Sequence, residues 1–206
     1  MNPTTINNMS TKEITKLELV FATQNRNKME EIQVMLPENI KLLCLKDINH
    51  TEDIPETADT IDGNAILKAD FVKNQLGYDC FADDTGLMVE ALDGAPGVYS
   101  ARYAGEEKND EANVQKLLKE MEGQQNRRAR FKTVIALNMN GHEILFTGIC
   151  TGSITTAKRG SHGFGYDPVF QPDGFDKTFA EMTLKEKSQL SHRSKAMREL
   201  IDYLSK

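Results

Sequence analysis

The chain reads LELVFATQNRNKMEEIQVML from residue 17 to residue 36, and this stretch predicts its fold class. The apolar run 17–22 is typical of a buried strand, and a polar cluster follows it. Apolar residues then recur on one helical face, at Met29, Ile32 and Leu36. Pro37 ends this pattern, and Asn27 with Glu30 resembles a capping arrangement at the helix start. Strand, tight polar loop and helix in this order are typical of an α/β domain.

The rest of the chain alternates strand and helix patterns. Strands are predicted at 41–45, 78–82, 131–139 and 143–149, and helices at 60–76, 109–121 and 191–206. Asn140-Gly141 supplies the residues that a tight hairpin turn requires. Because no repeat or linker divides the chain, we expect one domain over residues 17–206. Its fold class is α/β, with a mixed sheet and helices on the faces of that sheet.

Composition and charge are those of a soluble globular protein. Of the 206 residues, 39% are hydrophobic and 27% are charged, and the formal net charge is -6. The negative balance argues against nucleic acid as a partner. No apolar run approaches the ~20 residues that cross a bilayer, so we expect no membrane association.

Three cysteines and a polar N-terminal segment bear on location. Cys44, Cys80 and Cys150 show no CxxC spacing, which favours reduced thiols and a cytoplasmic protein. Residues 1–16 lack the apolar core of a signal peptide, and we expect a mobile polar tail with Met9 as an alternative start.

The polar loop TQNRNK at residues 23–28 is a candidate phosphate site. A turn from strand to helix presents backbone N–H groups at the positive end of the helix dipole. Lys28 adds a full positive charge, while Thr23 and Asn25 add neutral donors. The alternative is a polar connector that carries a surface lysine.

Carboxylates gather in two further places. Asp83 and Asp84 follow an apolar run, and we expect them at the end of a strand, facing a cleft. Glu52, Asp53 and Glu56, with Asp59, lie in the loop before the second helix. Carboxylate oxygens suit Mg²⁺ bound to substrate phosphates. The alternative is a helix cap followed by a solvated acidic loop.

A third group could bind a nucleobase. In FGYDPVF, residues 164–170, Phe164 offers a stacking face and Asp167 an acceptor. Lys187 can reach phosphate, and Arg193 beside His192 can donate to a base edge. The alternative assigns Phe164 to the core and the basic residues to the surface.

Five motifs occur in one order between Thr23 and Ala196: TQNRNKMEEI, NAILKA, DDTGLMVEALDGAPGVYSARYAG, GFGYDPVF and EKSQLSHRSKA. This combination closely resembles the inosine triphosphate pyrophosphatase family, which removes dITP, ITP and XTP from the nucleotide pool. The resemblance implies a curved mixed sheet with two lobes and an active-site cleft between them. It also implies a magnesium-dependent enzyme that forms a homodimer.

The resemblance implies a role for each matching residue. The triphosphate would be held by Thr23, Gln24, Asn25, Arg26, Asn27, Lys28, Lys68 and Lys187. The base would be framed by Phe164, Gly165, Tyr166, Asp167, His192 and Arg193. Asp84 would be the catalytic acceptor and a magnesium ligand, Glu56 the second ligand, and Thr85 a substrate contact. Relatives usually have glycine where this chain has Gln24, and Glu52 remains an alternative to Glu56.

The expected reaction releases pyrophosphate. A water activated by a carboxylate would attack the α-phosphorus, and donors that match a 6-keto group would reject adenine. Two other functions stay open: a pyrophosphatase for modified pyrimidine nucleotides, and a nucleotide sensor without catalysis. The ranking of dITP, ITP and XTP and the rejection of GTP also stay open.

Overall fold

A single mixed sheet of six strands organises the chain, in the order β2-β1-β3-β4-β5-β6. The computed structural model describes residues 16–206, so the predicted tail and Met9 lie outside the described residues, except for Lys16. The strands are β1 (Leu17–Phe21), β2 (Ile40–Cys44), β3 (Cys80–Val89), β4 (Arg128–Met139), β5 (His142–Ile154) and β6 (Phe170–Pro172). β1 pairs in parallel with β2 and β3, and the other pairs are antiparallel. The predicted α/β class with a curved mixed sheet is confirmed.

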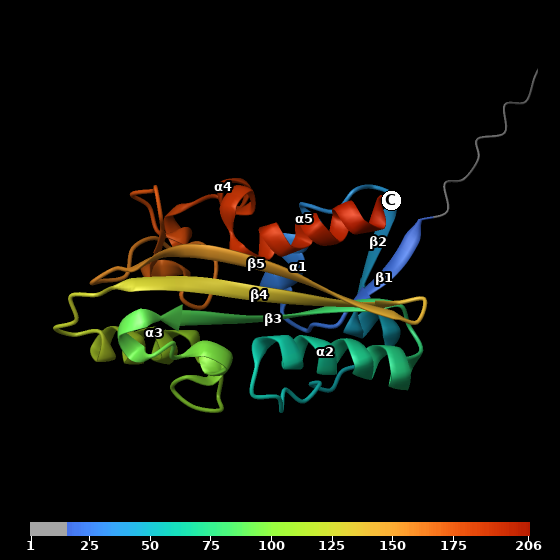
Figure 1. Cartoon of the computed structure of the whole chain (residues 1–206), viewed down its shortest axis with the longest axis horizontal. Helices are drawn as coiled ribbons and strands as arrows, with labels where there is room; N and C mark the ends of the chain where they lie inside the picture. The colour runs from blue at the N-terminus through green and yellow to red at the C-terminus, as the bar shows by residue number, and fades with distance from the viewer. Residues whose placement is uncertain (1–15) are drawn as a thin grey trace, which may run out of the picture.

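Helices cover both faces of this sheet, as Figure 1 shows. They are α1 (Arg26–Gln33), α2 (Ile61–Phe71), α3 (Asp110–Glu120), α4 (Leu184–Leu190) and α5 (His192–Leu204). α2 and α3 lie below the long strands β3, β4 and β5 in the view of Figure 1, and α5 lies above them. None of the helices within residues 16–206 has the length and apolar character needed to span a bilayer.

Alternation along β3 explains how the sheet packs against both layers. Phe81 points into the cluster beneath α5, while its neighbours Cys80 and Ala82 point into the cluster beneath α2. On the α2 side, the small residues Ala65 and Ala69 are fully buried, which lets the helix lie close to the strands. Because β3 is buried on both faces, its sequence is continuously apolar up to residue 82.

The turn between β4 and β5 and the end of the α2 region agree with their predictions. Asn140 and Gly141 have φ of 52° and 76°, the left-handed values that a two-residue hairpin of the I′ type requires. Beyond α2, Val72–Leu76 continues as a π-helical turn and Gly77 ends it at φ 80°.

One prediction about a helix start was wrong, and one helix was not predicted. α1 begins at Arg26 and not after an Asn27 cap, because Asn25 is extended and its side chain accepts from the backbone N–H of Lys28 at 3.2 Å. The sequence analysis also missed α4. That helix has only seven residues, too few for an apolar period, and its start is fixed by Thr183 and Glu186 as a capping box.

The predicted strand end at Asp83-Asp84 was also wrong. β3 continues to Val89 because β4 pairs with it along its full length, from Cys80–Asn138 to Val89–Ala129. The parallel neighbour β1 pairs with β3 only as far as Phe81. The two carboxylates therefore lie in the middle of β3, at the point where β1 leaves it and the β1–α1 loop begins.

Candidate active site

A pocket of about 290 Å³ opens where β1 leaves β3. Its walls come from the β1–α1 loop, the loop before α2, the middle of β3, the loop before α3, the 164–167 loop and the start of α5. Most of the predicted site residues line it: Thr23, Gln24, Asn25, Lys28, Glu56, Lys68, Asp84, Thr85, Phe164, Gly165, Tyr166, Asp167, Lys187, His192 and Arg193. Arg26 and Asn27 do not, because both are exposed on the first turn of α1.

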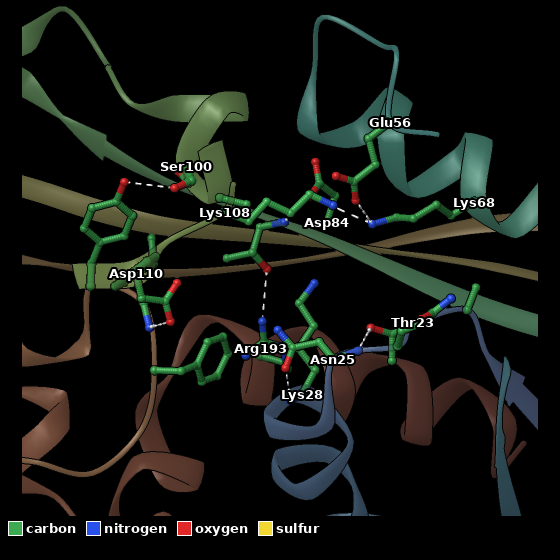
Figure 2. Close-up of a pocket in the computed structure, with 18 of the residues that line it drawn as sticks. Thr23, Asn25, Lys28, Glu56, Lys68, Asp84, Ser100, Lys108, Asp110 and Arg193 are labelled. Carbon is green, nitrogen blue, oxygen red and sulfur yellow. Dashed lines mark hydrogen bonds and ion pairs between the residues drawn. The ribbon is translucent and has the colours of Figure 1, made fainter. Parts of the chain in front are cut away.

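Asp84, Glu56 and Lys68 form an acidic and basic group at one end of the pocket (Figure 2). Asp84 accepts from the backbone N–H of Thr85 at 2.9 Å and from the Asn64 amide at 3.3 Å. Its Oδ1 lies 4.0 Å from Nζ of Lys68, which donates to Glu56 at 2.5 Å. Two carboxylates from different elements thus converge on one ammonium group.

Burial and charge shift the acid–base properties of this group. Burial raises the pKa of Asp84, although Lys68 and Lys28 partly oppose the shift. Burial lowers the pKa of Lys68, but the carboxylates of Asp84, Glu56 and Asp83 outweigh it and hold the pKa above its ordinary value. Asp84 is therefore a stronger proton acceptor than a solvated aspartate, and Lys68 stays charged.

Asp83 is buried next to the pocket and does not line it. It accepts from Lys28 at 2.7 Å and from Nε of Arg193 at 3.0 Å. Burial raises the pKa of Asp83, but these cations and Lys68 overcome burial and hold it well below its usual range. Of the two neighbouring aspartates, Asp84 therefore faces the pocket while Asp83 holds two cations in place.

Glu31 of α1 extends the ionic network beneath the pocket. It is buried, and it accepts from Arg193 and, at 2.6 Å, from Lys187. Lys187 also donates to Asp167 at 2.5 Å. The order of charges along the network is alternating: Lys28, Asp83, Arg193, Glu31, Lys187 and Asp167. Each buried charge thus has an opposite partner, as a buried ion requires.

Phe164 adds an aromatic ring to the pocket lining. Its ring is half-buried, with Nζ of Lys187 at 5.2 Å and the Arg193 guanidinium carbon at 5.6 Å from the ring centroid. Oδ2 of Asp167 accepts from the backbone N–H of Phe164 at 3.0 Å and holds the loop in place. A Cβ on Gly163 would meet that oxygen at 2.0 Å, so only glycine fits there. The structure groups Lys187 with this aromatic end.

His192 is a buried imidazole in the pocket wall. Its ring stacks on Phe131 with centroids 4.4 Å apart, and it is buried. Burial lowers its pKa well below the ordinary value, and the charges of Arg193 and Lys187 add to that shift. Within residues 16–206, its Nδ1 has no hydrogen-bond partner, so a bound ligand could supply one.

Comparison with known proteins assigns the family. The sequence profile of the Ham1 family matches residues 19–203. The chain belongs to the Ham1 family. The motif-based resemblance is thereby confirmed, because curated relatives bear the name dITP/XTP pyrophosphatase. One from Christiangramia forsetii is 63% identical, over 92% of this chain and 100% of its own length. One from Flavobacterium johnsoniae is 62% identical, over 92% and 98%.

Solved structures of Ham1 proteins have the same fold. The Ham1 protein of Staphylococcus aureus superposes with a TM-score of 0.83 at 40% identity, over 91% of this chain and 98% of that one. A HAM1 protein from Coxiella burnetii gives 0.84 at 39% identity, over 92% and 98%. Because these superpositions cover more than nine tenths of this chain, the whole described sheet shares the fold of the Ham1 proteins.

In this Ham1 chain, the side chain of Gln24 joins two loops. Its side-chain amide donates to the backbone carbonyls of Thr51 and Glu52, at 2.9 and 2.7 Å. The β1–α1 loop is thereby joined to the acidic loop that carries Glu56. Glu52 contributes its backbone there and does not line the pocket, whereas Glu56 does.

Three polar residues of the lining were not predicted from the sequence: Ser100, Lys108 and Asp110. Asp53 also lines the pocket, and the sequence indicates it only as one carboxylate of the acidic loop. Ser100 accepts from the Tyr166 hydroxyl at 2.9 Å through its carbonyl. Asp110 accepts from the backbone N–H of Gly165 at 2.8 Å and ties the aromatic loop to α3. Charged residues near a helix start are ordinary surface residues by pattern, so only the fold could bring them to this pocket.

Proposed function

We propose that this protein hydrolyses dITP, ITP and XTP to the nucleoside monophosphate and pyrophosphate. Relatives more than 60% identical, over nearly their full length, are named dITP/XTP pyrophosphatases. The observation that carries the proposal is one pocket lined both by the charged pair Asp84 and Lys68 and by the aromatic ring of Phe164 beside Arg193. Such a pocket can hold a polyphosphate and a base together.

We further propose that Asp84 and Glu56 hold Mg²⁺. The fit rests on donor type and on charge. Both residues supply hard carboxylate oxygens and lie within 4.0 Å of the same ammonium group. The lining also has as many carboxylates as cations: Asp53, Glu56, Asp84, Asp110 and Asp167 against Lys28, Lys68, Lys108, Lys187 and Arg193. A triphosphate adds negative charge that a divalent ion would offset.

We propose that the protein side chains contribute acid–base catalysis and electrostatic stabilisation. Asp84 accepts the proton of the water that attacks the α-phosphorus, and the bond to the pyrophosphate oxygen breaks. Lys28 and Lys68 stabilise the charge that develops on the leaving pyrophosphate. Bound Mg²⁺ supplies further electrostatic stabilisation of the phosphates. No covalent intermediate on the protein is needed.

Base selection is proposed to depend on Arg193 and His192. Arg193 donates three hydrogen bonds, to Asp83, Glu31 and Thr85. Two of its five N–H groups are therefore left for a ligand. A 6-keto purine accepts from such donors, whereas the 6-amino group of adenine is itself a donor. Sites of this kind can discriminate by about 10⁴.

Pyrophosphate release tests the proposal. We expect ITP and XTP to be hydrolysed with kcat/KM at least about 100-fold above that of ATP, and only with Mg²⁺. GTP and modified pyrimidine triphosphates complete the panel. Preference for a pyrimidine nucleotide would replace the proposed substrate class. Binding of ITP without turnover would identify a sensor.

We also propose a biological role, a location and an oligomeric state. Removal of non-standard triphosphates would keep them out of DNA and RNA, and we propose a cytoplasmic homodimer. All three cysteines are free, which fits a reducing compartment. Light scattering after gel filtration measures the oligomeric state, and a mass of twice 23.1 kDa is expected.

A further inference from the structure

Lys108 stands apart from the other cations of the pocket. It belongs to the loop between the short helix η4 (Gly97–Arg102) and α3, and it lines the pocket. Its backbone has φ 51°, a left-handed value that is uncommon outside glycine and that costs free energy. Figure 2 shows its side chain extended toward the group of Asp84, Glu56 and Lys68.

The other four cations are buried and committed to carboxylates. The side chains of Lys28, Lys68, Lys187 and Arg193 are at most 15% exposed, and each has at least one close carboxylate partner. Removing any of them from its partner would leave a buried charge unpaired, which is strongly unfavourable. These cations are therefore fixed parts of the wall.

Lys108 has a different environment. Its side chain is 51% exposed, and its partner is Asp53, which is 73% exposed, at 3.3 Å. Water screens an ion pair of this kind, so the pair contributes little to stability. Lys108 can leave Asp53 at low free-energy cost. It lines the same pocket as Glu56 and Asp84, which places its charge where a polyphosphate could reach it.

We propose that Lys108 leaves Asp53 when a nucleotide binds and donates to the polyphosphate on the side of the pocket that carries Glu56. The inference rests on the proposed function and adds a substrate-binding residue to it. A charged donor on phosphate strengthens binding before and during the reaction alike, so Lys108 acts on KM more than on kcat.

A purely structural role for the same ion pair makes the opposite prediction. If the Asp53–Lys108 pair only closed the acidic loop over the pocket, Asp53→Asn and Lys108→Ala would impair the enzyme equally. If Lys108 binds phosphate, Lys108→Ala raises KM for ITP about tenfold with kcat within about twofold. Asp53→Asn then leaves KM unchanged or lowers it, because it removes a competitor for the ammonium group.

Lys41 provides the matched control. Its side chain is 53% exposed, and among residues 16–206 it pairs with Glu18 alone, at 2.6 Å. The pair lies on β2 and its neighbour β1 and does not line the pocket. Lys41→Ala should leave KM and kcat unchanged, and Lys108→Arg, which keeps the charge, should restore most of the affinity. Equal increases in KM for Asp53→Asn and Lys108→Ala would overturn the proposal, as would an unchanged KM in Lys108→Ala.

Calorimetry with inorganic pyrophosphate separates this inference from the proposed function. Lys108→Ala should weaken pyrophosphate binding about tenfold relative to the parent protein, with Lys41→Ala unchanged. If the parent hydrolyses ITP but both proteins bind pyrophosphate equally, only the role of Lys108 is overturned. If the parent hydrolyses no triphosphate while the difference in pyrophosphate binding remains, the proposed reaction falls and the anion site stands.

Discussion

At the scale of single residues, Asp84 is the side chain on which the proposed chemistry depends most. Asp84→Asn keeps the shape of the side chain but removes the proton acceptor and the negative charge. We expect kcat for ITP to fall about 10³-fold, with KM changed only a few-fold. Because burial raises the pKa of Asp84, the neutral variant should unfold at an equal or higher temperature. Retained turnover in a folded variant would remove Asp84 from its role.

Glu31 supports a prediction about stability and pH. It holds Lys187 and Arg193 in the buried network, so Glu31→Gln should cost about 3 kcal/mol in the free energy of unfolding. Glu30 is exposed on the same helix, and Glu30→Gln is the matched control, with little change expected. Denaturant unfolding followed by circular dichroism measures both variants, and equal effects would contradict this role.

The pKa of Glu31 gives the sign of the pH effect. Burial raises this pKa, but Arg193 and Lys187 outweigh burial and hold it below its ordinary value. A carboxyl whose pKa is lower in the folded state stabilises the protein above the unfolded pKa. That contribution is lost as pH falls through the folded pKa. The free energy of unfolding of the parent protein should therefore decrease as pH falls below about 4.3. The Glu31→Gln variant should lack this part of the decrease.

At the scale of elements, the acidic loop before α2 depends on Gln24. Gln24→Gly introduces the residue usual in relatives and removes both hydrogen bonds to the carbonyls of Thr51 and Glu52. We expect amide hydrogen exchange in residues 51–56 to accelerate about tenfold, and KM for ITP to rise. The 140–141 hairpin, far from the loop in sequence, serves as the internal reference. Unchanged exchange in residues 51–56 would show that the loop is held by other contacts.

Sequence patterns predicted the elements that have their own signals. Apolar periods identified α2 and α5, helical composition identified α3, and Asn140-Gly141 identified the hairpin. The patterns did not predict features that depend on contacts with another part of the chain. Nothing in DDTG indicates that β3 continues, because its extension depends on β4, a strand more than 40 residues further along the chain. α4 was missed because capping, and not periodicity, defines it.

The candidate site shows the same division. Resemblance to a family indicated residues that the structure brings to the pocket, including Asp84, Lys68 and Arg193. It did not reveal that Asp83 and Glu31 hold the cations from below, since these pairs join residues that are 55 to 162 positions apart. Lys108 was not predicted as a site residue for a related reason. Its position in the lining depends on how the loop before α3 returns to the pocket.

At the scale of the whole molecule, the curved sheet places two kinds of surface in one pocket. The departure of β1 from β3 opens space above Asp84, and the start of α5 brings His192 and Arg193 to the same space. Under the proposed function, phosphate chemistry and base recognition would therefore rest on the same support, the buried network that links Lys28 to Lys187. Changes in that network should affect both ends of the pocket together.

A crystal structure of Asp84→Asn with ITP and Mg²⁺ tests this arrangement most directly, because the variant should bind the nucleotide without consuming it. The account predicts the hypoxanthine ring against Phe164 and Arg193, and the triphosphate beside Lys28 and Lys68. A nucleotide bound outside this pocket, or with base and phosphates exchanged between its ends, would contradict the account.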